Sequence, residues 1–286
     1  MLGASALRQK SVMLIAHITD PHLGLDTRFL PGHPGPQEAL RRALSHVRKL
    51  DPAPEVLLIT GDLADSGAES DYDTLRTVLA DTLPSPADGG PRVWAVLGNH
   101  DDRAAARRIL GEMLDPAADA PEGLICLHTQ HGGLHFIGLD TVVPRRPHGE
   151  LDDTQLNWLA RQLQACAGEP VVIFMHHPPL VSGMEVMDRC GLLRGREQLG
   201  ALVRAHGNVQ LIAAGHLHRP VVGLLGGAPV LVEPSCSHQL ELDLRTHGQL
   251  AVRLEPPKVG LYRWTPEDGL ACHFSHVHAY PGPFVI

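Results

Sequence analysis

The sequence has 286 residues, of which 43% are hydrophobic and 20% charged, and its formal net charge is -8. This composition is ordinary for a globular protein and excludes a largely disordered chain. No stretch gathers the Lys and Arg residues that bind a long nucleic acid by counterion release, and no window reaches the roughly 18 consecutive apolar residues of a membrane span.

The first predicted element is a strand over residues 12–20, which ends in Asp20. We interpret it as a strand and not as a signal peptide, because the apolar run continues directly into a polar motif. Later apolar runs are nearly continuous, which is typical of strands covered on both faces. They predict strands over residues 55–62, 92–101, 134–141, 170–177 and 209–218.

Segments with helical spacing of apolar residues alternate with these strands and predict an α/β (α+β) domain over residues 1–255. The predicted helices are 37–50, 70–81, 101–114, 153–165 and 194–206, the fourth capped by Asp152 or Asp153. Residues 219–254 predict an additional antiparallel set of strands with a turn at His247 and Gly248. The Pro-rich residues 256–286 predict a C-terminal arm that serves as a dimerisation or lid element.

The five cysteines are scattered and include no C-x-x-C pair, which favours reduced thiols in a cytoplasmic protein. Each is expected to be a small buried hydrophobic residue outside the functional site. They are Cys126, Cys166, Cys190, Cys236 and Cys272.

Polar side chains follow the ends of five predicted strands, which is where ligands collect in open α/β sheets. Carboxylate, amide and imidazole donors without thiolates suit Mn, Fe, Co or Zn ions and argue against a structural zinc cage. Seven candidate ligands are too many for one ion, so a site with two divalent or trivalent ions is expected. The candidates are Asp20, His22, Asp62, Asn99, His176, His216 and His218.

Each of these residues alone has a structural alternative, as a helix cap, a turn former or a surface group. Five motifs in order, all at strand ends, weigh against that alternative for the whole set. Converging polar groups would be costly to bury without a cation.

In this order, the motifs D-x-H, G-D, G-N-H-D, H and G-H-x-H resemble the calcineurin-like metallophosphoesterase superfamily. The H-H-P-P at 176–179 and the L-D-x…G-E-L-x-x-x-Q-L-x-W-L run at 139–159 resemble its class III cyclic nucleotide phosphodiesterases and glycerophosphodiesterases. The resemblance covers about residues 13–240. It implies a four-layer α/β/β/α sandwich with two mixed sheets flanked by helices.

The resemblance also implies how the seven ligands divide between two ions. One set is Asp20, His22 and His218, the other is Asn99, His176 and His216, and Asp62 bridges both ions. His100 would contact the scissile phosphate and assist the leaving group. Asp65 would orient His100.

The expected reaction is in-line attack on phosphorus by a metal-bound hydroxide, without a covalent intermediate. The lack of a basic groove favours a small phosphodiester, and the resemblance implies 3',5'-cyclic nucleotides or glycerophosphodiesters, between which the sequence does not choose. A phosphomonoesterase or nucleotidase with the same ions is the alternative enzyme. A non-catalytic interaction module would be expected to lack ligands. The tail and the additional strands offer a means of forming a homo-oligomer.

Several other polar residues have expected roles outside the ligand set. His17 and His135 are expected to be hydrogen-bonded sheet residues, and the H-x-x-H-x-H string at 273–278 to lie on the surface. His177 either supports the preceding ligand or contacts substrate. Asp101 is expected to brace neighbouring loops.

Overall fold

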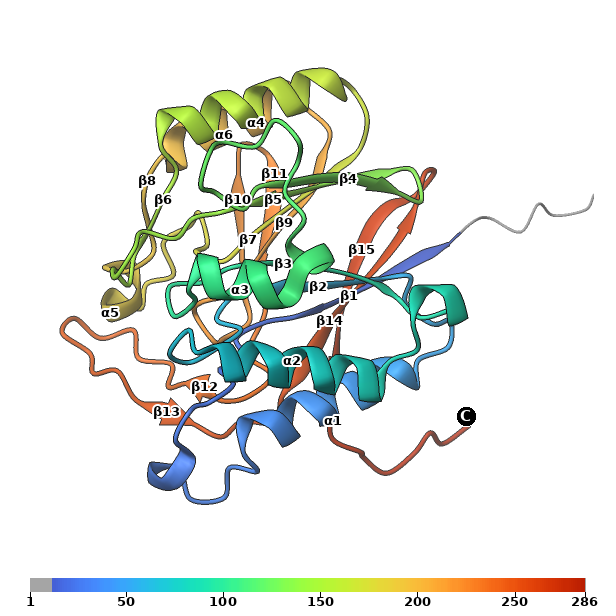
Figure 1. The fold of residues 1–286 in the computed structure, drawn as a ribbon, viewed down its shortest axis with the longest axis vertical. Helices are drawn as coiled ribbons and strands as arrows, with labels where there is room; N and C mark the ends of the chain where they lie inside the picture. The colour runs from blue at the N-terminus through green and yellow to red at the C-terminus, as the bar shows by residue number, and fades with distance from the viewer. Residues whose placement is uncertain (1–11, 286) are drawn as a thin grey trace, which may run out of the picture.

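The computed structural model describes residues 12–285, which form two mixed β-sheets packed between helices (Figure 1). The first sheet has the strand order β15-β14-β1-β2-β3, with β1, β2 and β3 parallel and β14 and β15 antiparallel. Its strands are β1 (Met13–Ile18), β2 (Val56–Thr60), β3 (Arg92–Val96), β14 (Lys258–Thr265) and β15 (Gly269–His276).

The second sheet has the order β10-β11-β9-β7-β5-β4, with four parallel strands between antiparallel edge strands. Its strands are β4 (Leu127–His131), β5 (Leu134–Leu139), β7 (Val171–Met175), β9 (Val209–Ala214), β10 (Val221–Leu225) and β11 (Ala228–Val232). β4 was not predicted from the sequence, because this edge strand is mostly polar and lacks the apolar run of a central strand.

Residues 219–254 differ from the separate antiparallel set that the sequence predicts. β11 pairs in parallel with β9, so β10 and β11 extend the second sheet. Farther along, only β12 (Gln239–Leu240) and β13 (Val252–Arg253) pair antiparallel. His247, at the predicted turn, has a left-handed φ of 62°. Another short pair, β6 (Gly149–Glu150) and β8 (Leu192–Arg194), is parallel.

The helices lie on the outer faces of the two sheets. α1 (Pro36–Arg48), α2 (Glu69–Thr82) and α3 (Arg103–Leu110) pack on the first sheet, and α4 (Asp153–Ala165) and α6 (Arg196–His206) on the second. α5 (Glu185–Asp188) is a single turn. A capping box of Asp152 and Gln155 starts α4. Gly111, at φ 46°, ends α3 earlier than predicted.

Two hydrophobic cores follow from this layering. One contains the buried faces of α1, α2 and α3, the first sheet, and inward residues of the second sheet such as Phe136 and Phe174. The other contains the outward residues of the second sheet, such as Ile173, together with Trp158 and Leu199 from α4 and α6. The predicted four-layer α/β/β/α sandwich is therefore confirmed.

The C-terminal residues are not a separate arm over their whole length. β14 pairs with β1 from Met13↔Trp264 to His17↔Gly260, and Tyr262 and Trp264 are buried. The free edge of β1 accounts for this pairing, because an unpaired strand edge presents open donors and acceptors. Residues 256–276 thus belong largely to the first sheet, while the dimerisation or lid role of the tail stays a prediction. No helix within residues 12–285 is long and apolar enough to cross a bilayer.

A buried polar chain runs between the sheets. The Thr60 hydroxyl lies 2.7 Å from His17 Nε2, and His17 Nδ1 lies 2.6 Å from the Tyr262 hydroxyl. Tyr262 donates to Glu233 Oε1 at 2.9 Å, whereas Glu233 Oε2 has no partner among the described residues. His17 is therefore the hydrogen-bonded sheet residue predicted from the sequence.

The buried Glu233 should make the free energy of unfolding depend on pH. Burial raises its pKa from an ordinary 4.5 to about 8, so between these values the folded chain retains a proton that the unfolded chain has lost. The free energy of unfolding therefore falls as pH rises through this window. Glu233→Gln removes this dependence, so its stability relative to the parent should rise by about 1.4 kcal/mol per pH unit. Urea denaturation of both proteins at pH 5, 6.5 and 8 measures the difference; a difference independent of pH would contradict the assignment.

Candidate metal centre

All seven predicted ligands lie in loops at the carboxyl ends of strands and meet at one edge of the two sheets. The loops are joined by backbone hydrogen bonds, from Asp20 N to Gly61 O and from Gly215 N to His176 O, each 3.1 Å long. The ligand loops follow β1 (Asp20, His22), β2 (Asp62), β3 (Asn99), β7 (His176) and β9 (His216, His218).

The backbone at these loops is strained in a consistent way. Within residues 12–285, seven non-glycine residues have positive φ, and five of them are predicted ligands. Such conformations cost about 1–3 kcal/mol each and concentrate at functional sites. The five are Asp20, His22, Asp62, His216 and His218, with φ between 47° and 70°.

Three of the histidines are oriented by a hydrogen bond from the outer ring nitrogen, Nδ1. His22 donates to the Asp65 carboxylate at 3.0 Å, His176 to the Thr60 carbonyl at 2.8 Å, and His218 to the His238 carbonyl at 2.8 Å. In a neutral ring held this way, Nε2 carries the lone pair, and it points into the cluster. This arrangement is typical of metal-ligating histidines.

The inner nitrogens converge on oxygen atoms and on one another. Nε2 of His22 lies 3.2 Å from Nε2 of His218, and Nε2 of His176 lies 3.2 Å from Asn99 Oδ1. Asp62 Oδ2 lies 3.5 Å from Nε2 of both His22 and His176. One carboxylate oxygen is therefore equidistant from a histidine of each predicted set.

This donor set fits cations. Asp20 Oδ1 is buried without a hydrogen-bond partner in the described chain, and it lies 3.4 Å from His218 Nε2. Burial opposes ionisation of Asp20, but His218, His176 and His22 outweigh it and lower its pKa. Burial and His176 lower the pKa of His216 to about 3, so its imidazole is neutral. Neutral imidazoles and ionised carboxylates are the forms that bind metal.

Two residues beside the ligands determine the shape of the loops, Asp101 by its hydrogen bonds and Gly61 by its backbone conformation. The Asp101 carboxylate accepts hydrogen bonds from the backbone N–H groups of Leu63, Ala64 and Gly98, which confirms its predicted bracing role. At Gly61, φ is 89°, and an added Cβ would lie 2.5 Å from His176 Nδ1. Only glycine permits this turn and this close approach.

His100 lies beside the cluster, but its contacts differ in part from the prediction. Its Nδ1 donates to the backbone carbonyl of Asp65 at 2.6 Å, while the Asp65 carboxylate is 3.8 Å away and holds His22. The Asp65 side chain thus orients a predicted ligand, and only its main chain contacts His100. Burial opposes protonation of His100, but Asp62 and the Asp65 carbonyl outweigh it and raise its pKa.

The contacts of His177 resolve the two roles that the sequence leaves open. Nδ1 lies 2.8 Å from the Thr141 hydroxyl, and Nε2 lies 3.2 Å from the Pro147 carbonyl. Both nitrogens are occupied and the side chain is buried, so His177 packs behind His176 and does not face a substrate.

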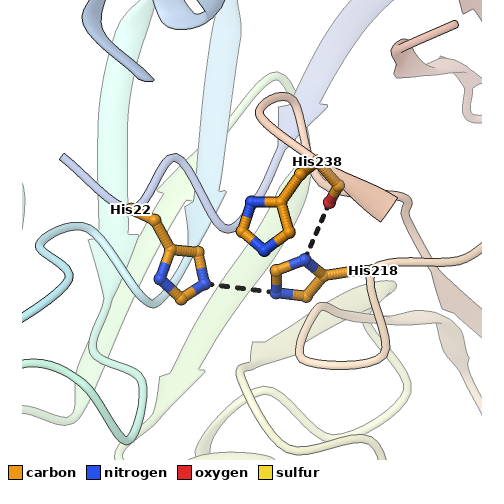
Figure 2. Close-up of side chains that lie close together, drawn as sticks. All are labelled: His22, His218 and His238. Atoms are coloured by element: carbon orange, nitrogen blue, oxygen red, sulfur yellow. Dashed lines mark hydrogen bonds between the residues drawn. The ribbon is translucent and has the colours of Figure 1, made fainter. Parts of the chain in front are cut away.

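His238 was not predicted from the sequence, because no motif surrounds it. Figure 2 shows its ring beside those of His22 and His218, with centroids 5.2 and 4.6 Å apart. Its Nδ1 is buried without a partner in the described residues. Burial, His218 and His22 lower the pKa of His238 to about 2, so the ring is neutral.

The ligands open into a pocket of about 630 Å³. Asp62, Asn99, His100 and His238 lie at its polar end, and none of the described residues that line it is Lys or Arg. Apolar side chains form the rest of the wall: Leu25, Phe29, Leu30, Met187, Leu240, Leu250 and Val252. Arg103 lies outside this lining and donates from Nε to Asp140 Oδ2 at 2.7 Å.

A model of the calcineurin-like phosphoesterase family matches residues 13–220, which include all seven predicted ligands. The chain is a member of the calcineurin-like phosphoesterase family.

Relatives of this calcineurin-like phosphoesterase are named for diester hydrolysis. A probable glycerophosphodiester phosphodiesterase of Arcobacter nitrofigilis is 30% identical over 95% of the chain and 96% of the relative. A cAMP/cGMP dual specificity phosphodiesterase of Mycobacterium tuberculosis is 35% identical over 82% of the chain and 71% of the relative.

Solved structures share the fold of this family member at low identity. A dimetal phosphatase from Danio rerio aligns with a TM-score of 0.63 at 16% identity, covering 93% of this chain and 99% of that one. A purple acid phosphatase from yellow lupin aligns with a TM-score of 0.66 at 14% identity, covering 94% and 52%. These likenesses agree with the four-layer architecture.

Proposed function

We propose that this chain is a phosphodiesterase that hydrolyses small phosphodiesters at a centre of two metal ions. The proposal rests mainly on the position of Asp62. Its Oδ2 lies 3.5 Å from Nε2 of His22, in the first ligand set, and 3.5 Å from Nε2 of His176, in the second. Such a carboxylate suits a bridge between two ions about 3.5–4 Å apart.

Asp20, His22 and His218 would hold the first ion, Asn99, His176 and His216 would hold the second, and Asp62 would be shared by both. Oxygen and imidazole ligands of this kind suit Mn, Fe, Co or Zn. When bound, two such ions neutralise charge on the phosphoryl oxygens and lower the pKa of a coordinated water from about 15.7 toward 7.

Two histidines of the pocket complete the proposed mechanism. His100 uses Nδ1 to hold the Asp65 carbonyl, so its Nε2 is available to donate a proton or a hydrogen bond to the leaving oxygen. His238 is neutral and lines the pocket beside the first ion's histidines, where its ring would contact the substrate. Neither role requires a covalent intermediate.

The pocket favours 3',5'-cyclic nucleotides as the substrate class. Its lining lacks Lys and Arg among the described residues, which suits a singly charged diester better than a doubly charged monoester. The apolar wall around Phe29, Leu30 and Met187 suits the face of a base. The relative named for cyclic nucleotides supports this choice, while the relative named for glycerophosphodiesters supports the second candidate.

A turnover screen of the Mn-reconstituted protein tests the substrate class. We expect kcat/KM for cyclic AMP or cyclic GMP to exceed that for glycerophosphodiesters by at least tenfold, because only a base fills the apolar wall. Phe29→Ala should lower kcat/KM for the cyclic nucleotides and leave the glycerophosphodiesters nearly unchanged. Equal preference in the parent protein would contradict this choice, and a reversed preference would make glycerophosphodiesters the substrates.

The proposal also includes a cytoplasmic location and a homo-oligomer. The location is supported by five cysteines that are free in the described structure. The oligomer is supported by exposed leucines in the segment between β12 and β13, where Leu242, Leu244 and Leu250 are 53%, 61% and 60% exposed. Light scattering of the purified protein would give the mass of a dimer or larger assembly, and a monomeric mass would contradict this part.

A further inference from the structure

A second group of metal-capable side chains lies away from the metal centre described above. It consists of His128 on β4, His135 at the start of β5 and Cys166 at the C-terminal end of α4, and the ligand atoms lie within 4.8 Å of one another. β5 runs from His135 toward the ligand loops, so this group lies at the opposite end of the second sheet. β4 is at the upper right of Figure 1.

The hydrogen bonds fix which nitrogen of His128 carries the proton. Gln162 donates its amide N–H to Asp119 Oδ2 at 2.8 Å, so the Gln162 oxygen must face His128. That oxygen lies 2.7 Å from His128 Nδ1, which is therefore the donor. In the neutral ring, Nε2 has no proton and carries a lone pair.

His135 is fixed in the same way by a carboxylate. Its Nε2 lies 3.0 Å from Glu169 Oε2, which accepts a hydrogen bond and so places the ring proton on Nε2. The remaining nitrogen, Nδ1, carries a lone pair. A histidine held by a carboxylate on its far side is a common feature of metal sites, because the carboxylate orients the ring and raises its basicity.

The two lone pairs point at each other. His128 Nε2 and His135 Nδ1 are 3.0 Å apart, and with both outer nitrogens acting as donors, no ring proton remains between them. Two unprotonated nitrogens at this distance repel unless a cation joins them. A separation of 3.0 Å leaves no room for water between the two nitrogens, and 13% of the His135 side chain stays accessible to an incoming ion.

Cys166, at the C-terminal end of α4, supplies the third ligand atom. Its side chain is buried, and its Sγ donates to the Gln162 carbonyl at 3.2 Å. Burial and Glu169 raise the pKa of this thiol, so without a cation it is protonated. On metal binding the thiol proton leaves to solvent and the thiolate takes its place as a ligand.

We propose that His128, His135 and Cys166 form a second metal site that binds one Zn²⁺, with water in the fourth position. Two imidazoles and a thiolate suit Zn²⁺, whose bonds of about 2.0 Å to nitrogen and 2.3 Å to sulfur place ligand atoms about 3.5 Å apart. The two ring nitrogens, 3.0 Å apart, would open slightly, and Cys166 Sγ, within 4.8 Å of the histidine ligand atoms, would move closer. The ion would join the β4–β5 hairpin to the end of α4, and its role is structural because it lies far from the phosphodiester pocket.

Cobalt substitution tests this site, because it can report the thiolate alone. Protein stripped with chelator and then loaded with Co²⁺ should show a thiolate-to-cobalt charge-transfer band in the near ultraviolet. The proposed catalytic ligands are all nitrogen and oxygen atoms and give no such band. Zn²⁺ should displace Co²⁺ and abolish the band, following the order of affinities for divalent ions. No band in the parent protein would overturn the proposal and leave a shared proton between the two rings as the explanation.

Three variants make the test specific. Cys166→Ser should abolish the band, whereas the matched variant Cys190→Ser should keep it, although Cys190 lines the pocket of the catalytic centre. Glu169→Ala changes an exposed side chain and should weaken cobalt binding about 10–100-fold, because His135 loses its orienting partner. Persistence of the band in Cys166→Ser, or its loss in Cys190→Ser, would refute the assignment. Cys166→Ser should retain its kcat with saturating catalytic metal.

Discussion

The Asp62→Ala protein is expected to lose one or both metal ions, and its kcat for a phosphodiester should fall by about 10³-fold or more. The reason is that Asp62 Oδ2 lies 3.5 Å from Nε2 of His22 and of His176, so one substitution removes a ligand from both proposed ions. A bound ion contributes several kcal/mol of transition-state stabilisation, and each 1.36 kcal/mol is tenfold in rate. Metal content by plasma mass spectrometry and kcat are measured on the same samples.

Asp65→Ala is the graded control for this change. The Asp65 carboxylate contacts His22 and no other predicted ligand among the described residues, so its loss should weaken one ion only, by about 10–100-fold in affinity. Excess metal should restore the activity of Asp65→Ala and should not restore that of Asp62→Ala. An Asp62→Ala protein that keeps two ions would contradict the bridging role.

His100→Ala is expected to lower kcat by about 10²–10⁴-fold while the metal content stays that of the parent protein. His100 contacts the Asp65 carbonyl through Nδ1 and lines the pocket, so the substitution removes a proton donor and leaves the ligands in place. The loss should depend on the leaving group. A p-nitrophenolate ion leaves without a proton, so a diester with an alkoxide leaving group should suffer a larger loss than bis(p-nitrophenyl) phosphate.

Two results would contradict the assignment of His100. Loss of a metal ion from His100→Ala would make it a ligand, and an equal loss with both kinds of leaving group would remove the proton-donor role. Restoration of kcat for the alkoxide substrate by added imidazole would support the role, because a small donor can occupy the space of the missing ring.

Most strands, and the candidate ligands at their ends, could be read from the sequence for one physical reason. Strands covered on both faces read as apolar runs, and in β2 or β7 such a run stops where the polar ligand begins. Asp62 and His176 therefore mark their own strand ends. The left-handed backbone of Asp62 was not predictable, because only the assembled site offsets its strain.

Other features depend on contacts between distant segments, and no local pattern encodes them. β14 joins the first sheet because β1 has a free edge, although its proline-rich surroundings suggested an arm. His238 reaches the centre through a loop without a motif. The Asp65 carboxylate bonds to His22 and not to His100: its Oδ1 lies 3.0 Å from His22 Nδ1 and 3.8 Å from His100 Nδ1.

Hydrolysis of bis(p-nitrophenyl) phosphate before and after metal removal tests the central claim most directly, with p-nitrophenyl phosphate as the monoester control. Chelation should abolish turnover of the diester, and added Mn²⁺ should restore it because the ligands remain folded in place. The diester should be the better substrate after reconstitution. Turnover that resists the chelator, or no turnover of either ester with Mn²⁺ bound, would contradict a phosphodiesterase with two metal ions.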